Sequence, residues 1–194
     1  VMLVRPPSRC GWGYMWAPLA VNLEYVAAAI EDLCDIEILN QEFNKTPVEK
    51  LLKDFQPDIF GVTMSATDHK AGLELCKLAK KYKCQTIVGG YHPTAIPDEL
   101  LTFDQIDIVA RGEAEITARE FIQKGTPEGV NGLSYRKDGK VIHNPARECV
   151  ANLDDLKFPA RHFRVGDECT MWTKKGERHR DQVHTSRGCW GKCT

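Results

Sequence analysis

The sequence has no long apolar run and no excess of charge of either sign. No stretch approaches the roughly 20 apolar residues of a membrane-spanning helix, so we expect no membrane span. Lys and Arg number 26 against 27 Asp and Glu, for a net charge of −1, which gives no electrostatic argument for binding nucleic acid or an anionic membrane. The first residues, Val1–Arg5, have the pattern of a strand rather than of a signal peptide. We therefore expect a cytoplasmic protein.

Most of the eight cysteines lack the spacing of metal ligands. Cys34, Cys76 and Cys84 lie in apolar segments, where a cysteine is usually a small buried residue with a reduced thiol. Cys189 and Cys193 differ, because they are close together and flanked by glycines. We treat only these two as candidate metal ligands.

Strands and helices alternate five times over the first 124 residues. Short apolar runs predict strands, and stripes of apolar residues three or four positions apart predict helices. This alternation is typical of an α/β fold with a doubly wound parallel sheet. The predicted strands are Val1–Arg5, Ile36–Leu39, Pro57–Met64, Gln85–Val88 and Ile106–Ala110, and the predicted helices are Pro18–Leu33, Pro47–Phe55, Asp68–Tyr82, Ile96–Phe103 and Ala114–Lys124.

The pattern changes after Gly125. Asp138-Gly139 between two short β runs predicts a hairpin, formed by Leu133–Arg136 and Lys140–His143. Asn152–Arg164 has no periodicity and is predicted to be a linker, and Gln182–Thr185 is predicted to be a further strand. We accordingly divide the chain into residues 1–125, 126–165 and 166–194.

Three of the predicted strands end in small or polar residues at one edge of the sheet. In an open parallel sheet, ligands bind beyond the carboxyl ends of the strands. Hydroxyl groups, bare backbone and helix N-termini suit a nucleotide-like cofactor with amide, phosphate and ring parts, although the glycines of a plain strand–helix turn would look the same. The candidate residues are Ser65, Ala66, Thr67, Gly89, Gly90, Tyr91, His92, Gly112 and Glu113.

Two of these positions resemble the cobalamin-binding fold of corrinoid proteins. Ser65 after the third strand and Gly89-Gly90 after the fourth match a serine and a glycine pair between which that family inserts the nucleotide tail of cobalamin. The longer stretches Val88–Pro97 and Ile106–Glu115, and the linker Leu153–Arg161, are similar to the cobalamin domain of radical S-adenosylmethionine enzymes. This resemblance implies a flavodoxin-like (Rossmann-like) five-stranded sheet of strand order 2-1-3-4-5. It also implies that Gly90→Val would abolish cobalamin retention and leave folding nearly intact.

The loop after the first strand departs from one branch of the family. Corrinoid proteins of the methionine-synthase type carry there a histidine that ligates cobalt, whereas residues 6–12 contain none. The loop instead carries several large aromatic side chains, which either cap the domain's own core or cover a ligand. In the radical subfamily such a loop, with Trp12 as our candidate, would contact the lower corrin face.

The end of the chain resembles the beginning of a cluster motif. Gly188-Cys189-x-x-x-Cys193 is similar to the first part of Cys-x-x-x-Cys-x-x-Cys, whose thiolates hold a 4Fe-4S cluster that binds S-adenosylmethionine. The third cysteine would fall at position 196, beyond Thr194. A lone pair of cysteines at this spacing is often incidental, and the interpretation depends on its placement after the predicted strand Gln182–Thr185 and after the family-like linker.

The resemblance implies the N-terminal fragment of a cobalamin-dependent radical S-adenosylmethionine enzyme, ending inside the cluster motif. A methyltransferase acting on an unactivated carbon is the first expectation. The alternatives are an oxidative cyclase related to the anaerobic magnesium-protoporphyrin monomethyl ester cyclase, or a non-catalytic module that binds a corrinoid or a flavin. The expected partners are the small-molecule cofactors and a C-terminal radical barrel, and we expect no turnover from these residues alone.

Overall fold

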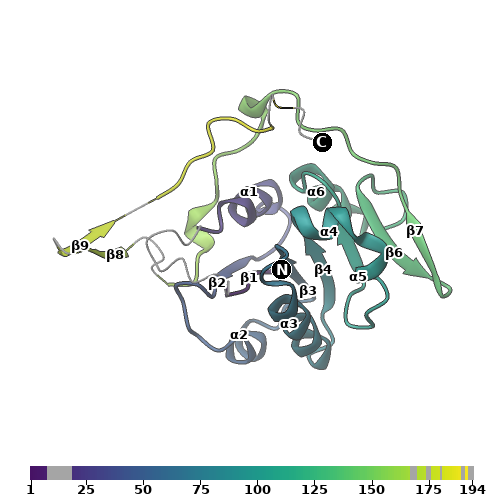
Figure 1. Cartoon of the computed structure of the whole chain (residues 1–194), viewed down its shortest axis with the longest axis horizontal. Coiled ribbons are helices and arrows are strands. Elements are labelled where there is room, and N and C mark those ends of the chain that lie inside the picture. The colour runs from purple at the N-terminus through teal and green to yellow at the C-terminus, as the bar shows by residue number, and fades with distance from the viewer. Residues whose placement is uncertain (8–18, 167–169, 174–175, 180, 189–190, 192–194) are drawn as a thin grey trace.

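A seven-stranded sheet forms the centre of the protein in the computed structural model, which describes residues 1–7, 19–166, 170–173, 176–179, 181–188 and 191 (Figure 1). Its strand order is β2-β1-β3-β4-β5-β6-β7. The first five strands are parallel, and β6 and β7 are antiparallel to their neighbours. The strands are β1 Met2–Arg5, β2 Glu37–Asn40, β3 Ile59–Thr63, β4 Gln85–Gly89, β5 Ile108–Ala110, β6 Leu133–Lys137 and β7 Lys140–His143.

The predicted parallel core and its order 2-1-3-4-5 are confirmed. The predicted hairpin is also present, and it extends the same sheet: Ser134 of β6 pairs with Val109 of β5. An edge strand left open exposes unpaired backbone groups. Pairing with β6 satisfies those groups of β5, and this long-range contact has no local sequence signal.

Helices cover both faces of the sheet (Figure 1). α1 and α6 lie side by side on one face, and α2 and α3 lie on the other. The predicted helix Ile96–Phe103 is instead the short α5, and another short helix, α4, precedes it, with Ile96 between them in a non-helical conformation (φ −130°, ψ 48°). The helices are α1 Val21–Ile30, α2 Val48–Phe55, α3 His69–Lys81, α4 Tyr91–Ala95, α5 Pro97–Leu100 and α6 Glu115–Lys124.

The alternation of side chains along the strands builds two separate layers of core. In β1, Met2 and Val4 pack in the layer beneath α2 and α3, whereas Leu3 packs in the layer beneath α1. Both layers are apolar because each face of a parallel sheet is covered by helices. Cys76 and Cys84 are buried free thiols, as predicted, and burial raises the pKa of Cys76 to about 12.

The segment after β7 crosses the sheet and lies along α1 and the edge strand β2. It contains two short 3-10 helices, η1 Leu153–Asp155 and η2 Arg161–Phe163. Arg164 forms an isolated parallel bridge with Ile38 of β2, and the Val165 N–H donates to the Ile38 carbonyl (2.8 Å). This contact covers part of the exposed β2 edge. A separate two-stranded sheet follows, β8 Thr170–Thr173 and β9 Gly176–His179.

The predicted strand Gln182–Thr185 is wrong. Its residues have no strand conformation, and the Gln182 carbonyl accepts a hydrogen bond from Arg161 Nη2 (2.8 Å). The Gln182 side chain accepts another hydrogen bond from the Leu19 N–H (3.0 Å). Hydrogen bonds that involve side chains therefore replace the backbone pairing that a strand would make here. Within the described residues, no helix is both long and apolar enough to cross a membrane.

Candidate functional site

Strand register brings three of the predicted loops to one edge of the sheet. Thr63 at the end of β3 pairs with Gly89 at the end of β4, and Gly89 pairs in turn with Ala110 at the end of β5. The loops that follow these residues therefore start side by side. Open parallel sheets bind ligands at this edge, beyond the carboxyl ends of the strands. We call it the carboxyl edge below.

The loop after β3 is a hydrogen-bonded turn built on Asp68. The Asp68 carboxylate accepts from the Ser65 backbone N–H (2.5 Å) and from the Ser65 hydroxyl (2.9 Å), and its side chain is buried. The Ser65 hydroxyl has one hydrogen, so Thr67, whose Oγ1 lies 2.9 Å away, donates to it. A hydroxyl oxygen has two lone pairs, and the Ser65 oxygen therefore keeps one acceptor position for a ligand. Ala66 and Thr67 are exposed beside it.

Asp68 was predicted only as the first residue of the helix Asp68–Tyr82, and not as a residue of the site. It precedes α3, but its side chain makes no capping bond to that helix. It fixes Ser65 instead. The short spacing Ser65-x-x-Asp68 was the available signal, and it was ambiguous because the same pattern is typical of helix starts.

Gly90 has a different role from the one that its pattern suggested. Its φ is +111°, and a Cβ built on it would lie 2.7 Å from the Met64 backbone oxygen. The bare backbone thus allows β4 to turn closely past the end of β3. A Cβ on Gly89 would make ordinary contacts with Ala110, at 3.6 Å or more. The expectation that Gly90→Val leaves folding nearly intact is therefore wrong, because the valine would meet protein backbone.

Thr94 of α4 ties the second loop to the third. Its hydroxyl donates to the Gly90 carbonyl (2.8 Å) and accepts from the Gly112 N–H (3.0 Å). A Cβ on Gly112 would meet no atom within 4 Å. Gly112, with φ +74°, is therefore the predicted glycine that borders open space.

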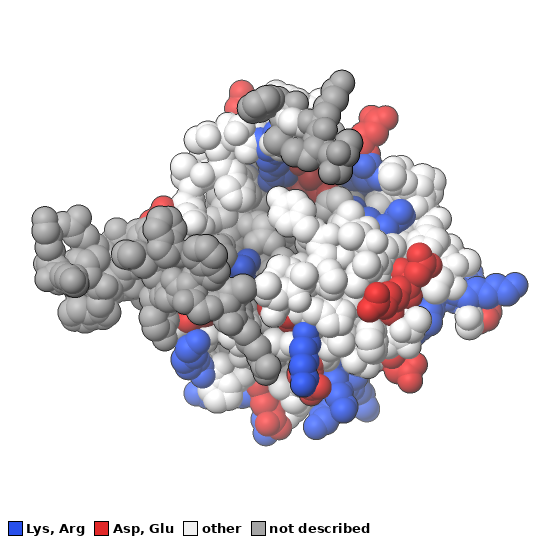
Figure 2. Space-filling view, viewed as in Figure 1, with Lys and Arg blue, Asp and Glu red and all other residues white. Residues whose placement is uncertain are grey.

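The two polar rings after β4 lie differently. His92 Nε2 is 2.9 Å from His69 Nδ1, so the pair joins α4 to the start of α3. Tyr91 is 96% exposed. In the face drawn in Figure 2, uncharged atoms predominate around α4, whereas acidic side chains lie at the place of α5, which contains Asp98 and Glu99. Tyr91 is thus an aromatic side chain available for contact.

Glu113 is turned to the protein rather than to the open edge. Its carboxylate accepts from the Val150 N–H (2.7 Å), and its other oxygen lies 3.4 Å from Arg187 Nη1. The space beside Gly112, the predicted site residue that precedes Glu113, remains open. The carboxyl edge therefore combines small residues and hydroxyls from the first loop with exposed backbone from the third.

Three predicted site residues, Trp12, Cys189 and Cys193, lie outside the described residues. Among the residues that the structure does describe, no group of three or more His, Cys, Asp or Glu is placed to hold a metal ion.

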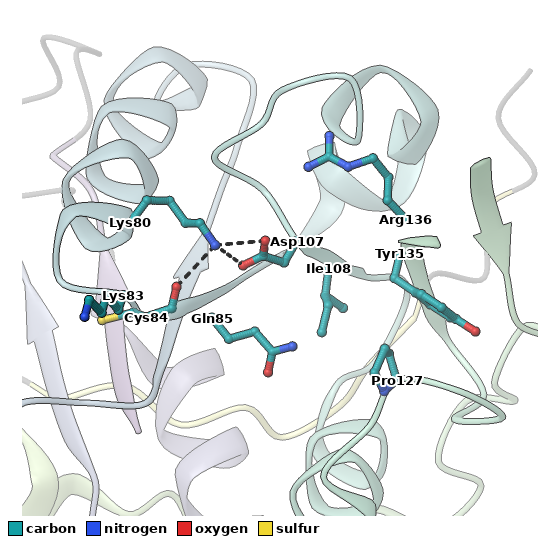
Figure 3. A pocket seen from close by; sticks show the side chains of 9 residues that line it. All are labelled: Lys80, Lys83, Cys84, Gln85, Asp107, Ile108, Pro127, Tyr135 and Arg136. Atoms are coloured by element: carbon teal, nitrogen blue, oxygen red, sulfur yellow. Dashed lines mark hydrogen bonds and ion pairs between the residues drawn. The ribbon is translucent and has the colours of Figure 1, made fainter. Parts of the chain in front are cut away.

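A hollow of about 390 Å³ lies at the opposite edge of the sheet (Figure 3). It is lined by Gln85 and Ile108, the first residues of β4 and β5. Three of its charged groups are engaged: Lys80 Nζ pairs with Asp107 (2.8 Å), and Arg136 Nη1 donates to the Leu101 carbonyl (2.6 Å). These contacts hold strands and loops together, and the hollow is separate from the predicted site.

Comparison with known proteins gives one matching family. The model described as "B12 binding domain" matches residues 13–122, a range that contains all three loops of the carboxyl edge. That description agrees with the cofactor that the Ser65 and Gly89-Gly90 pattern predicted.

Two named relatives are methyltransferases. An uncharacterized methyltransferase of Pyrococcus horikoshii is 31% identical over all of this chain, which covers 44% of that protein. A cytidylyl-2-hydroxyethylphosphonate methyltransferase of Streptomyces wedmorensis is 26% identical over 82% of this chain and 36% of that protein. The chain thus spans less than half the length of these curated relatives.

Solved structures share the fold. The cobalamin-dependent S-adenosylmethionine radical enzyme OxsB, with aqua-cobalamin and S-adenosylmethionine bound, superposes with a TM-score of 0.70 at 24% identity, over 82% of this chain and 24% of that one. The radical S-adenosylmethionine methyltransferase TsrM of Kitasatospora setae, with cobalamin and a [4Fe-4S] cluster bound, gives a TM-score of 0.62 at 17% identity, over 81% of this chain and 30% of that one.

Proposed function

Because this chain belongs to the B12 binding domain family, we propose that it holds cobalamin at the carboxyl edge of its parallel sheet. The observation that carries the proposal is the register of β3, β4 and β5. Thr63, Gly89 and Ala110 are neighbours across the sheet, so the three predicted loops begin together. The family match supports cobalamin over a flavin as the ligand.

The residues of the edge suit the parts of the cofactor in different ways. The Ser65 oxygen has an acceptor position for an amide or hydroxyl donor, and Ala66 and Thr67 leave the space beside it free of bulk. Gly112 offers open backbone, and Tyr91 an exposed ring. Gly89, Gly90 and His92 shape the loop that carries Tyr91, and Glu113 holds the turn after β5 through its contacts with Val150 and Arg187.

For the whole protein we propose a cobalamin-dependent radical S-adenosylmethionine enzyme, with methyl transfer to an unactivated carbon as its reaction. The names of the methyltransferase relatives support this reaction. A further relative, the 4'-phospho-dehydrooxetanocin synthase of Priestia megaterium, is 26% identical over 84% of this chain and 23% of that protein. Its name is that of a synthase and not of a methyltransferase, which supports keeping a second candidate reaction, and we retain the oxidative cyclase as that candidate. When bound, cobalamin supplies a cobalt centre that can carry the methyl group.

We propose that the three parts of the chain have the roles that the sequence indicated. Residues 1–125 would bind cobalamin, residues 126–165 would form the hairpin and linker, and residues 166–194 would begin the radical domain. Cys189 and Cys193 would ligate a 4Fe-4S cluster together with residues of that domain. We further propose a cytoplasmic location, in keeping with the free thiols of Cys34, Cys76, Cys84 and Cys149.

The test compares two glycines with matched backbone strain. Gly112 and Gly139 have φ of +74° and +73°, and a Cβ on either meets nothing within 4 Å, but Gly139 lies in the β6–β7 turn, far along the sheet from the edge. We expect Gly112→Leu to weaken hydroxocobalamin binding at least tenfold and Gly139→Leu to leave it unchanged, because only the first fills the proposed site.

The measurement is the visible spectrum of each protein after incubation with hydroxocobalamin or with flavin mononucleotide and then desalting. Retention of flavin but not of corrinoid by the parent chain would overturn the proposal. Equal corrinoid affinity in the two leucine variants would place the cofactor elsewhere.

A further inference from the structure

Arg187 connects three parts of the molecule that are far apart in the sequence. Its Nη2 lies 2.5 Å from Glu115 at the start of α6, and its Nη1 lies 3.4 Å from Glu113. Its guanidinium carbon stands 5.0 Å from the centre of the Tyr25 ring in α1. One side chain thus joins the C-terminal segment to the loop after β5 and to α1. We call this group of four residues the Arg187 clamp.

Glu115 depends on this contact. It is 5% exposed, and within the described part of the chain the only ion pair or hydrogen bond of its carboxylate is to Arg187. A buried charge that loses its partner is strongly unfavourable. The arrangement also suits arginine specifically, because a planar guanidinium can span two carboxylates and stack on a ring, whereas an ammonium group cannot.

The clamp is the last of a series of contacts that dock the segment 181–188. Asp181 pairs with Arg161 (2.7 Å) and with Arg164 (3.0 Å). His184 stacks on Tyr25, with ring centres 5.9 Å apart. Thr185 and Ser186 are exposed. Arg187, the next residue, contacts Glu113 and Glu115 and so returns the chain to the carboxyl edge of the sheet.

We propose that Arg187 is a positioning residue, which holds the chain just before Cys189 against the carboxyl edge of the sheet. This inference rests on the proposed function, since its purpose is to start the thiol pair near the cobalamin site. Two residues of chain span at most about 7 Å, so a fixed Arg187 limits how far the first thiol can lie from the loop of Gly112 and Glu113. Arg187 would then attach the start of the radical domain to the cobalamin domain.

Amide hydrogen exchange of the 194-residue chain without cofactor tests the clamp by itself. We expect Arg187→Gln and Glu115→Gln each to raise exchange over residues 184–188 at least tenfold, and the double variant to add little, because both remove the same contact. Arg187→Lys should recover only part of the protection. The control is Lys157→Gln, which removes another contact of the C-terminal region with α1, to Glu31 (3.0 Å), and should leave residues 184–188 unchanged.

A distance measurement tests the positioning. A nitroxide amino acid replaces the exposed Ser186, the chain is loaded with cob(II)alamin, and pulsed dipolar spectroscopy gives the distribution of distances between the two spins. We expect a narrow distribution in the parent and in Lys157→Gln, an intermediate width in Arg187→Lys, and a distribution at least twice as broad in Arg187→Gln with the corrinoid still bound.

Unchanged exchange and an equally narrow distribution in Arg187→Gln would overturn the inference. So would an equal loosening by Lys157→Gln, because the effect would then be a general loss of docking. Failure of the parent chain to bind a corrinoid would instead overturn the proposed function, and the exchange result would still decide whether the clamp exists.

Discussion

The sheet and the segment that crosses it are held by different forces. The strands are held by apolar residues such as Phe60, Val88 and Val109, all of them fully buried. The crossing segment, residues 151–166 and 181–188, leaves its large apolar residues Phe158 and Val183 mostly exposed, at 92% and 70%. Its other contacts include several ion pairs and hydrogen bonds, beside the packing of Ala160, Phe163 and Val165 on the core.

This difference separates a sheet that is held mainly by apolar burial from a segment that adds several ion pairs to a smaller apolar contact. Hydrophobic stabilisation is proportional to the apolar area removed from water, whereas exposed ion pairs are weak and are screened by salt. The segment that leads toward Cys189 is therefore attached reversibly where its pairs are exposed, and firmly where they are buried. Three predictions probe this contrast.

The largest effect is expected where a charge is fully buried. Glu24 of α1 is 0% exposed and lies 2.6 Å from Arg164, whose side chain is 7% exposed. Glu24→Ala should lower the free energy of unfolding by about 3 kcal/mol, because it takes from the buried guanidinium one of its two carboxylate partners, Glu24 and Asp181. Urea denaturation measures this. Lys157→Ala, which breaks an exposed pair of the same segment, should cost at most about 1 kcal/mol, and similar costs for the two variants would contradict the contrast.

A smaller effect is expected within the sheet itself. Gly90→Val should destabilise by about 2–3 kcal/mol, because a β-branched residue would have to take a positive φ beside the Met64 carbonyl. Gly89→Ala is the control, since its Cβ makes ordinary contacts, and it should cost less than about 1 kcal/mol. Thermal unfolding of both variants without cofactor makes the comparison. A Gly90→Val chain as stable as the parent would restore the view that this glycine serves only the ligand.

The smallest effect concerns pH. Lys124 and Arg147 hold the pKa of Glu120 below its ordinary value of 4.5, so this pair stabilises the fold above pH 4.5 and the contribution is lost as the pH falls through the lowered pKa. Exposed pairs of this kind contribute below about 1 kcal/mol. Glu120→Gln should flatten the fall in stability below pH 4.5 by that amount. Denaturation at a series of pH values measures it, and an unchanged slope would show that the pair contributes nothing.

Much of the fold was predictable because its signals are local. The apolar run at Ile59–Thr63 and the stripe along α3 each report their own conformation, and the alternation of the two kinds of element fixes a parallel sheet. The candidate edge followed from the same logic, since strand ends carry Ser65, Gly89 and Gly112. The family match to residues 13–122 agrees with that pattern.

The failures of prediction occurred where the decisive partner is distant in the sequence. Gln182 is separated from Leu19 by 163 residues, and their hydrogen bond replaces the predicted strand. Gly90 looked like a ligand contact, because the carbonyl that it must clear comes from the preceding strand.

The sequence by itself thus determined the order of strands, the edge at which a cofactor would bind and the family. The tertiary structure alone decided which way Glu113 faces and that Glu115 pairs with Arg187, 72 residues away. The reason is physical: apolar periodicity is set by the geometry of one strand or helix, whereas the partner of a buried charge depends on which distant segments the fold brings within a few ångströms.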